Sequence, residues 1–526
     1  MKRRQRFSFL FAFLTLLGLA GGPLAPATHA QAVTTRPATS PDSLRELSQE
    51  RRPPALTPVV VPTDTLVQIS SCPGAGPKVR VSGILFVGNG VTKERTMRAE
   101  LDFREGDSLT LAELPARLEA NRRRVFNLQL FHAVLAQASC GGSGQLTVLF
   151  AVQERWYLLP IPILSIADSN PNRWLDRPAS ERWRRIDYGL HLVHNNMRGR
   201  AEQLTVNLQL GFNRKYELFY EVPGFGRRRR VGVGFGVSYY QSRNLDYETH
   251  GDSLKSLREV ETDAFAIQRF YATGGLRLRH TVQLLSALDV SYHREQLSDL
   301  IYQLNPAYYL GLQQRQYLEA VASTTNNRRN TFAYPLTGSF MQATLTFRQF
   351  LGGFGRPPAY ATARVHYARY LSLGHNFYYA LGLWAQSRLF THDLAYGDSH
   401  VFGYDVVVRG YDRYGVEGQH YGLVQQGLSY RAWAPPPLHL PFLSSSKVNT
   451  LPLAVYLNAF ADAGLTGGQL GYEASATNRL PGQLLASGGL GLHLVTYYDR
   501  VFCFEVARTL TVYPKTWFLV RASFPI

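Results

Sequence analysis

Residues 156–526 alternate between apolar and polar side chains over long runs. In the segment 200–211, for example, Leu204, Val206 and Leu208 are separated by single polar residues. Successive side chains of a strand point to opposite faces, and in a transmembrane strand one face meets lipid while the other meets the lumen. The pattern therefore predicts transmembrane β-strands.

Sixteen segments of this kind follow one another along the chain. An even number of strands returns a closed antiparallel barrel to the side of the membrane on which it starts. We therefore predict an all-β membrane barrel of 16 antiparallel transmembrane strands over 156–526. The strands are expected near 157–168, 184–195, 200–211, 214–222, 230–242, 264–278, 281–294, 312–325, 338–350, 359–371, 376–389, 420–432, 452–462, 485–496, 499–509 and 516–526.

The predicted topology places the long connections on the extracellular side. These connections are 243–263, 295–311, 390–419 and 463–484. The connection 433–451 falls on the periplasmic side, where it is unusually long for a turn.

The first 30 residues have the layout of a secretory signal peptide. Cationic residues precede an apolar stretch at 7–20, and small residues up to Ala30 offer a cleavage site. No later segment supplies the ~18–20 continuous apolar residues of a transmembrane helix, so if the mature protein is in a membrane, strands must carry it. Residues 31–77 are rich in Pro and Thr and predict a linker, with at most a short amphipathic helix at 40–52.

Residues 78–155 predict a small α/β domain. A strand over 78–90 is followed by two helical patterns, and a capping box at Thr110–Glu113 starts the second, which runs to Phe126. Two further strands are joined by the turn CGGSG at 140–144. The predicted order is a strand, two helices and a hairpin.

Composition and charge narrow the classes of partner. The chain has 45 Gly, 30 Tyr and 29 Phe but only 4 Met, which suits long strands with aromatic girdles. Its formal net charge is +18, yet no nucleic-acid motif is present and the export signal argues against that partner. Outer-membrane lipids and lipopolysaccharide, or charged pore walls, explain the basic balance instead.

The sequence contains no motif for a metal or for catalysis. The 14 His show no metal-ligand spacing, and no GxSxG or similar nucleophile set appears. We therefore predict no metal, no cofactor and no catalytic residue. Barrel enzymes can draw catalytic residues from several strands, so that class stays an alternative at this point.

Two motifs place opposite charges within reach of each other. One lies in the connection 390–419 and the other on the thirteenth predicted strand. Their residues are Val408, Arg409, Gly410 and Tyr411 in VRGY, and Phe460, Asp462 and Gly464 in FADAG. A guanidinium can bind a carboxylate through two parallel hydrogen bonds, so we predict a contact between Arg409 and Asp462. Gly410 would permit a tight loop tip and Gly464 would end the strand, whereas a solvated arginine on the pore wall is the alternative.

Within this strand pattern, VRGY and FADAG resemble the BamA/TamA superfamily of outer-membrane assembly barrels. In that family the arginine lies at the tip of a long extracellular loop folded into the lumen, and the aspartate lies on the inner wall. The phrases VGN, FREGD, NLQLF and QER of 78–155 resemble a POTRA domain, and NTFAYPLTG at 330–338 is a further similarity. The resemblance implies one POTRA domain before the barrel, whereas the main assembly protein of the family has several.

The closing strand resembles the terminal signal by which assembly machinery recognises its clients. Its apolar residues on one face are Phe518, Val520, Ala522, Phe524 and Ile526. The strand differs from the commonest form of the signal because it ends Phe-Pro-Ile instead of on an aromatic residue, and Pro525 has no backbone N–H to donate to a ladder. The seam beside it is expected to be short or imperfect.

The resemblance implies a non-enzymatic role in outer-membrane protein insertion or in translocation of a client. The POTRA domain would bind an extended client by strand addition, and the seam between the first and last barrel strands would offer a second edge. The implied partners are an unfolded outer-membrane or secreted client and periplasmic accessory proteins. The implied location is the bacterial outer membrane, with the POTRA domain in the periplasm.

Two alternatives stay open. One is a two-partner-secretion transporter for a single dedicated client, which a plugging helix at 40–52 would favour. The other is a passive channel or a barrel enzyme, which would not need VRGY or FADAG.

Three cysteines leave an odd number in an oxidising compartment. Cys72 precedes the first strand of the POTRA domain and Cys140 lies in the turn before its third, so parallel neighbouring strands would bring their Cα atoms to about 5.5 Å. We predict a disulfide between Cys72 and Cys140 that excludes Cys503; three separate thiols are the alternative.

Overall fold

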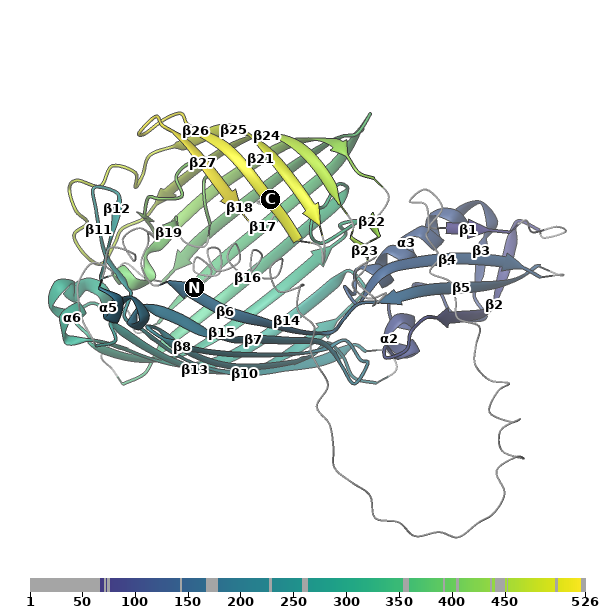
Figure 1. Cartoon of the computed structure of the whole chain (residues 1–526), viewed down its shortest axis with the longest axis horizontal. Coiled ribbons are helices and arrows are strands. Elements are labelled where there is room, and N and C mark those ends of the chain that lie inside the picture. The colour runs from purple at the N-terminus through teal and green to yellow at the C-terminus, as the bar shows by residue number, and fades with distance from the viewer. Residues whose placement is uncertain are drawn as a thin grey trace, which may run out of the picture.

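The computed structural model describes residues 67–70, 72, 76–141, 144–166, 178–226, 229–257, 264–352, 359–390, 393–403, 406–435, 438–439, 450–451, 453–496 and 500–521. It consists of a large barrel with a small α/β module at one end (Figure 1). Within these residues no helix is long and apolar enough to cross a membrane. The predicted signal peptide and the predicted helix at 40–52 lie outside the described residues.

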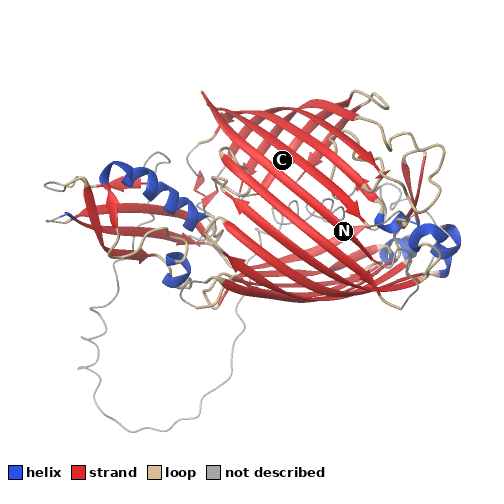
Figure 2. Cartoon of the chain, turned by 180° about the vertical axis from the view of Figure 1, so that it is seen from behind, coloured by secondary structure: helices blue, strands red, loops and turns tan. Residues whose placement is uncertain are grey.

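The barrel wall is one antiparallel sheet of 16 strands, in which each strand pairs with its neighbours in chain order. The strands are β6 (Leu158–Ile166), β7 (Ile186–Met197), β8 (Glu202–Gly211), β9 (Arg214–Val222), β10 (Val231–Ser242), β13 (Ile267–Arg279), β14 (Leu284–Leu297), β15 (Gln314–Asn327), β16 (Gly338–Phe350), β17 (Ala359–Gly374), β18 (Phe377–Leu389), β21 (His420–Trp433), β24 (Ala454–Gly467), β25 (Leu485–Thr496), β26 (Arg500–Thr509) and β27 (Thr516–Arg521). The prediction of 16 antiparallel strands is confirmed, and Figure 2 shows the wall as strand throughout, with helices confined to the two ends.

The ends of β24 and β27 differ from the prediction. β24 continues past the predicted end at 462 to Gly467, because its ladder with β21 runs on to the pair His420 and Gly467. Gly464 therefore lies inside the strand and does not end it. β27 is described only to Arg521, so Ala522, Phe524, Pro525 and Ile526 lie outside the described residues.

The alternation of the sequence separates an apolar outer face from a polar inner face. The outer face includes side chains that are more than half exposed, which suits contact with lipid: Phe235, Val290, Leu490 and Phe518. Polar residues at the opposite positions are buried on the lumen side. Examples are Asn207, Ser238, Glu295, Asn458 and Glu505.

The two ends of the barrel differ in their connections. We call the end that carries the α/β module the module end, and the opposite end the loop end. At the loop end lie β11 (Asp246–His250), β12 (Ser253–Ser256), α5 (Ala179–Arg184) and α6 (Asp299–Leu304) (Figure 1). The long connection 433–451 contains a short hairpin of β22 (Leu438–His439) and β23 (Thr450–Leu451) at the module end, and its other residues from 436 on lie outside the description.

The module is a five-stranded sheet covered by helices. Its elements are β1 (Val67–Ile69), β2 (Lys78–Val87), α2 (Glu94–Arg98), β3 (Ser108–Thr110), η2 (Leu111–Glu113), α3 (Leu114–Phe126), β4 (Phe131–Cys140) and β5 (Gln145–Glu154). The sheet order is β1-β4-β5-β2-β3, so two strands of three residues are added to the predicted three. Leu118 and Val125 of α3 are fully buried in the core with Val148 and Phe150 of β5. Thr110 makes no side-chain cap bond because a 3-10 turn precedes α3, so the capping-box prediction is wrong.

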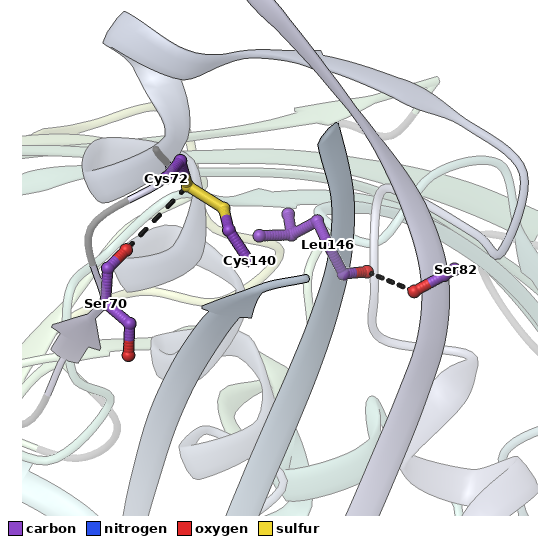
Figure 3. Close-up of a disulfide and its surroundings, with 5 residues drawn as sticks. All are labelled: Ser70, Cys72, Ser82, Cys140 and Leu146. Atoms are coloured by element: carbon purple, nitrogen blue, oxygen red, sulfur yellow. Dashed lines mark hydrogen bonds between the residues drawn. A yellow bond between two sulfur atoms is a disulfide. The ribbon is translucent and has the colours of Figure 1, made fainter. Parts of the chain in front are cut away.

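A disulfide holds the first strand of the module in place (Figure 3). β1 pairs in parallel with β4, and Cys72 just after β1 is bonded to Cys140 at the end of β4 with 5.0 Å between their Cα atoms. β1 lies in the segment predicted as linker. It joins the sheet because Val67 and Ile69 pack against the core of the module. Cys503 is buried in β26, outside this bridge.

The module contacts the turns at its end of the barrel. The backbone N–H of Lys93 donates to the carbonyl of Gly199 (2.9 Å), and the Thr96 hydroxyl donates to the same carbonyl (3.1 Å). Arg279 at the end of β13 forms an ion pair with Glu100. A Cβ at Gly199 would lie 2.2 Å from the carbonyl oxygen of Val91, so this turn needs glycine for the close approach.

Candidate functional site

The connection 390–419 folds back against the inner wall of the barrel. We call it loop 6, because it is the sixth connection at the loop end. Its Phe402, Val408 and Tyr411 are fully buried and belong to one apolar cluster with Leu423 of β21 and Leu485 of β25. Within the loop, β19 (His400–Phe402) pairs with β20 (Val416–Glu417). Apolar burial therefore holds the loop against the wall before any charge is considered.

Arg409 and Asp462 form a two-pronged ion pair. Arg409 Nε lies 2.8 Å from Asp462 Oδ2, and Nη2 lies 2.5 Å from Oδ1. The Arg409 backbone N–H also donates to Oδ2 (3.1 Å). Both side chains are at most 1% exposed, which excludes the alternative of a solvated arginine on the pore wall. Charge-assisted pairs of this geometry are about twice as strong as neutral hydrogen bonds.

A second carboxylate faces the same guanidinium. Arg409 Nη1 lies 3.2 Å from Oε1 of Glu505, a fully buried residue of β26. The guanidinium carbon lies 3.8 Å from the ring centroid of Phe460, and Nη2 donates to the carbonyl of Gln426 (3.3 Å). We call the set of Arg409, Asp462 and Glu505 the arginine anchor. It joins loop 6 to β24 and β26 at once.

Ion pairs beside the arginine anchor connect loop 6 to the last described strand. Arg521 of β27 donates from Nε to Glu505 Oε2 (3.2 Å) and from Nη2 to Asp412 Oδ1 (2.5 Å). Asp412 follows VRGY directly and also accepts from the Gly410 N–H (3.0 Å). Loop 6 is therefore tied to β27 through charges of both signs.

The remaining motif residues shape the contact between loop and wall. Gly410 has a φ of 93°, which a residue with a side chain rarely adopts. At Gly464 a Cβ would lie 2.7 Å from Val408 Cγ2 and 2.9 Å from Phe402 Cζ, so this glycine makes room for loop 6. Tyr411 is fully buried and donates to the carbonyl of Val512 (2.9 Å).

A second charged cluster holds the start of loop 6, and here the loop supplies the acid and the wall supplies the cations. Asp398 accepts from Arg315 of β15 (2.6 and 3.0 Å) and from Arg348 of β16 (2.9 Å). Burial alone would raise the pKa of Asp398, but the two arginines outweigh it and hold this pKa well below its usual range. We call the set of Asp398, Arg315 and Arg348 the aspartate anchor.

Several residues of the two anchors were not predicted from the sequence. Glu505, Arg521, Arg315 and Arg348 lie on predicted strands, at positions that face the lumen. A charge at a lumen-facing position of an alternating strand is the signal that could have drawn attention to each. No such signal marks Asp398, because it lies in an irregular connection.

The ends of the 16-stranded sheet are β6 and β27. No ladder joins these two strands within their described residues. Phe518 and Val520 of the predicted terminal signal point outward and are exposed. The other three residues of that signal, at 522, 524 and 526, are not described.

The described residues contain no group of three or more His, Cys, Asp and Glu side chains that could hold a metal ion. The chemistry that the two anchors offer is ion pairing within the protein.

Comparisons with known proteins identify the family of the chain. Residues 196–496 match the model of the Omp85 superfamily domain. No curated protein matches the chain. Among solved structures, BamA from Haemophilus ducreyi lacking POTRA domains 1–3 is 15% identical, with a TM-score of 0.45 over 84% of this chain and 83% of that chain. CdiB from Escherichia coli is 14% identical, with a TM-score of 0.47 over 84% and 74%. These values are too low to carry function from either protein to this chain.

Proposed function

Because the chain belongs to the Omp85 superfamily, it is an outer-membrane barrel for the insertion or transport of proteins, and we propose that it inserts outer-membrane proteins by adding client strands at the seam between β6 and β27. The observation that carries this proposal is the lack of a ladder between these strands in the described residues. An unpaired edge within a bilayer exposes backbone groups that lipid cannot satisfy. A client strand would satisfy them.

Loop 6 favours insertion at the seam over passage through the lumen. Two anchors on separate parts of the wall hold the loop inside the barrel, and its apolar residues are buried there. A translocated chain would have to displace both anchors, whereas a strand added at the seam would leave them in place. The same argument weighs against a passive channel.

The module offers a second binding edge, which we place on β2. β3 pairs only with Lys78–Arg80 of β2, and the backbone hydrogen bonds of the segment before β3 reach no farther along β2 than Val81. Farther along β2, the N–H of Ile84 donates to Glu105 (3.2 Å) and its carbonyl accepts from Arg98 (2.7 Å). Arg98 and Glu105 are themselves an ion pair (3.0 Å), so two side chains occupy the positions that an added strand would take.

Exposed apolar side chains beside this edge support its use. Leu85 and Val87 of β2 lie on the solvent face of the module, and Leu85 is 55% exposed. An extended client that displaces Arg98 and Glu105 would gain backbone hydrogen bonds and cover these side chains. We further propose that the module lies in the periplasm, with the loop end outside and lipopolysaccharide around the apolar outer face.

Reconstitution tests the proposed function. Liposomes that contain the full-length protein are mixed with urea-unfolded barrel proteins of several unrelated sequences, and folding is followed by the gel band shift of folded barrels. We expect several clients to fold faster than with empty liposomes. Acceleration of one client alone would favour the two-partner-secretion alternative, and no acceleration of any client would contradict the proposal.

Crosslinking tests the edge on β2. A photoreactive residue at Leu85 should capture unfolded clients, whereas the same residue at Glu113, exposed at the start of the helical side, serves as the matched control. Arg98→Ala with Glu105→Ala should raise capture at Leu85, because the edge at Ile84 is then open. Equal capture at both sites would contradict this part of the proposal.

A further inference from the structure

Two prolines lie in the first strand of the barrel sheet. β6 has the sequence LLPIPILSI, with Pro160 and Pro162 separated by one residue. Proline has no backbone N–H, so each leaves one position of the strand without a donor. Because the two are two residues apart, their backbone groups point to the same side of β6.

Hydrogen bonds at both ends of β7 show which side this is. The Asn195 N–H donates to the Tyr157 carbonyl (3.0 Å), so odd-numbered positions of β6 face β7 and even-numbered ones face away. At the other end, the Phe212 N–H donates to the Ile186 carbonyl (3.1 Å). Ile186, the register partner of Ile166, therefore faces β8, which gives the same alternation. Pro160 and Pro162 leave the ladder with β7 intact and remove two donors from the opposite edge.

The edge of β27 differs in this respect. The Thr509 N–H donates to the Lys515 carbonyl (3.0 Å), so odd-numbered positions of β27 face β26. The backbone groups of Thr516, Phe518 and Val520 therefore face away from β26, and all three carry an N–H. In the described residues this edge is complete in donors and acceptors, while the edge of β6 lacks donors in its middle.

This asymmetry penalises closure of the barrel onto itself. A ladder between β6 and β27 would leave two β27 carbonyls without partners opposite Pro160 and Pro162, in a bilayer that offers no substitute. A separate strand with ordinary residues can satisfy every group of the β27 edge. Arg521 keeps β27 tied to Asp412 and Glu505, so its edge is held in a fixed position.

We infer that β27, and not β6, is the edge that accepts an incoming strand. The occupant we assign is an extended, amphipathic client segment that runs antiparallel to β27. Its apolar side chains would lie beside Phe518 and Val520, which are 66% and 45% exposed on the outer face. This inference rests on the proposed insertion function and adds which of the two edges serves it.

Site-directed crosslinking compares the two edges in the full-length protein in liposomes. One added cysteine is placed on β27 (Thr516→Cys) or on β6 (Leu164→Cys). The probe is a synthetic peptide with the amphipathic sequence of residues 202–211 and one terminal cysteine. A peptide on β6 would lack two hydrogen bonds, at Pro160 and Pro162, each worth about 1 kcal/mol. We therefore expect the yield of crosslinked peptide to be roughly tenfold or more higher on β27 than on β6.

Matched variants test the role of the backbone donors. Phe518→Pro should abolish the crosslink at Thr516→Cys, whereas Phe518→Ala, which keeps the N–H, should retain it. Pro160→Ala with Pro162→Ala should raise the yield at Leu164→Cys several-fold. Leu158→Ala with Ile166→Ala, which trims the same edge positions without adding donors, should not.

Three outcomes would overturn the inference. They are an equal or higher yield on β6, no crosslink at either edge, and dimers through Thr516→Cys without peptide, which would mean that a second copy occupies β27. A preference for β27 together with no acceleration of client folding in liposomes would instead retain the inference and contradict the proposed function.

Discussion

The two anchors of loop 6 use the same chemistry with opposite polarity. At the arginine anchor the loop supplies the cation and the wall supplies the acids, whereas at the aspartate anchor the loop supplies the acid and the wall supplies the cations. The loop therefore cannot exchange its two ends without bringing like charges together. The arrangement of charges therefore determines which part of the loop binds which part of the wall, and the ion pairs themselves strengthen the binding.

The anchors also differ in the number of ion-pair partners that their wall residues have. Among the described residues, Arg409 is the only cation in an ion pair with Asp462. At the aspartate anchor each wall arginine has another carboxylate, since Arg315 pairs with Glu295 and Arg348 pairs with Glu319 (both 2.7 Å). Loss of the loop residue should therefore lower the free energy of unfolding more at the arginine anchor than at the aspartate anchor.

Substitution at the arginine anchor should give the largest effect. Arg409→Ala strands the buried Asp462 carboxylate, and Asp462→Ala takes the two-pronged partner from Arg409. Each should lower the free energy of unfolding by about 3–5 kcal/mol. The double variant should be little worse than either single variant, because the two residues act as one unit. Urea unfolding in detergent, followed by tryptophan fluorescence and gel band shift, measures these values.

Arg409→Lys is the control for the two-pronged geometry. A single ammonium cannot reproduce the parallel hydrogen bonds to Asp462, so this variant should recover little of the lost stability. Strictly additive losses in the double variant, or full recovery with lysine, would contradict the arginine anchor.

Removal of the disulfide should destabilise the module and leave the two anchors of the barrel unchanged. Cys72→Ser with Cys140→Ser opens a link over 68 residues and should destabilise the module by about 2–4 kcal/mol. Limited proteolysis of β1 measures this change. Both anchors are remote from the bridge, so the band shift of the barrel should be unchanged. Thiol labelling of the denatured, unreduced wild-type protein should detect one cysteine, Cys503, and detection of three would contradict the bridge.

Asp398→Asn should have a smaller effect than Arg409→Ala. The amide keeps the size of the side chain but loses the charge, while Arg315 and Arg348 keep Glu295 and Glu319. We expect a loss of about 1.5–3 kcal/mol, measured by the same urea unfolding. A loss as large as that of Arg409→Ala would show that sharing of charge does not distinguish the anchors.

A buried acid near the end of loop 6, Glu417, should give the smallest effect, as a dependence of stability on pH. Burial, outweighing the hydrogen bond from the Thr249 hydroxyl, raises the pKa of Glu417 in β20 from 4.5 to about 7. The folded state then binds this proton more tightly than the unfolded state does, so the contribution of Glu417 to stability is full below pH 4.5 and is lost as the pH rises to about 7. Protease resistance of loop 6 at different pH values measures this trend.

Glu417→Gln is the matched variant. It cannot ionise, so the fall between pH 4.5 and 7 should disappear while the resistance at low pH stays near that of the wild type. An unchanged pH profile would assign the dependence to another group.

The sequence by itself determined the strands and one part of the site. Alternation with a period of two is a local property, and lipid on one side and lumen on the other enforce it in every strand. It therefore predicted the 16 strands, with errors only near their ends. VRGY and FADAG could be paired because both lie at defined places in that strand order.

Only the tertiary structure decided the contacts that depend on distant partners. Asp398 lies in an irregular loop, and nothing local shows that it meets Arg315 and Arg348. The addition of β1 to β4 likewise depends on an edge that exists only once the module has folded.

In β6, the sequence determined one property of the two prolines and the tertiary structure decided another. Their spacing in the sequence places Pro160 and Pro162 on one side of β6, whichever side that is. Whether the missing donors face β7 or the seam depends on the hydrogen-bond register with β7, and a shift of one residue would reverse it. That register is set by β7 and β8 together, so the open edge is a property of the folded sheet.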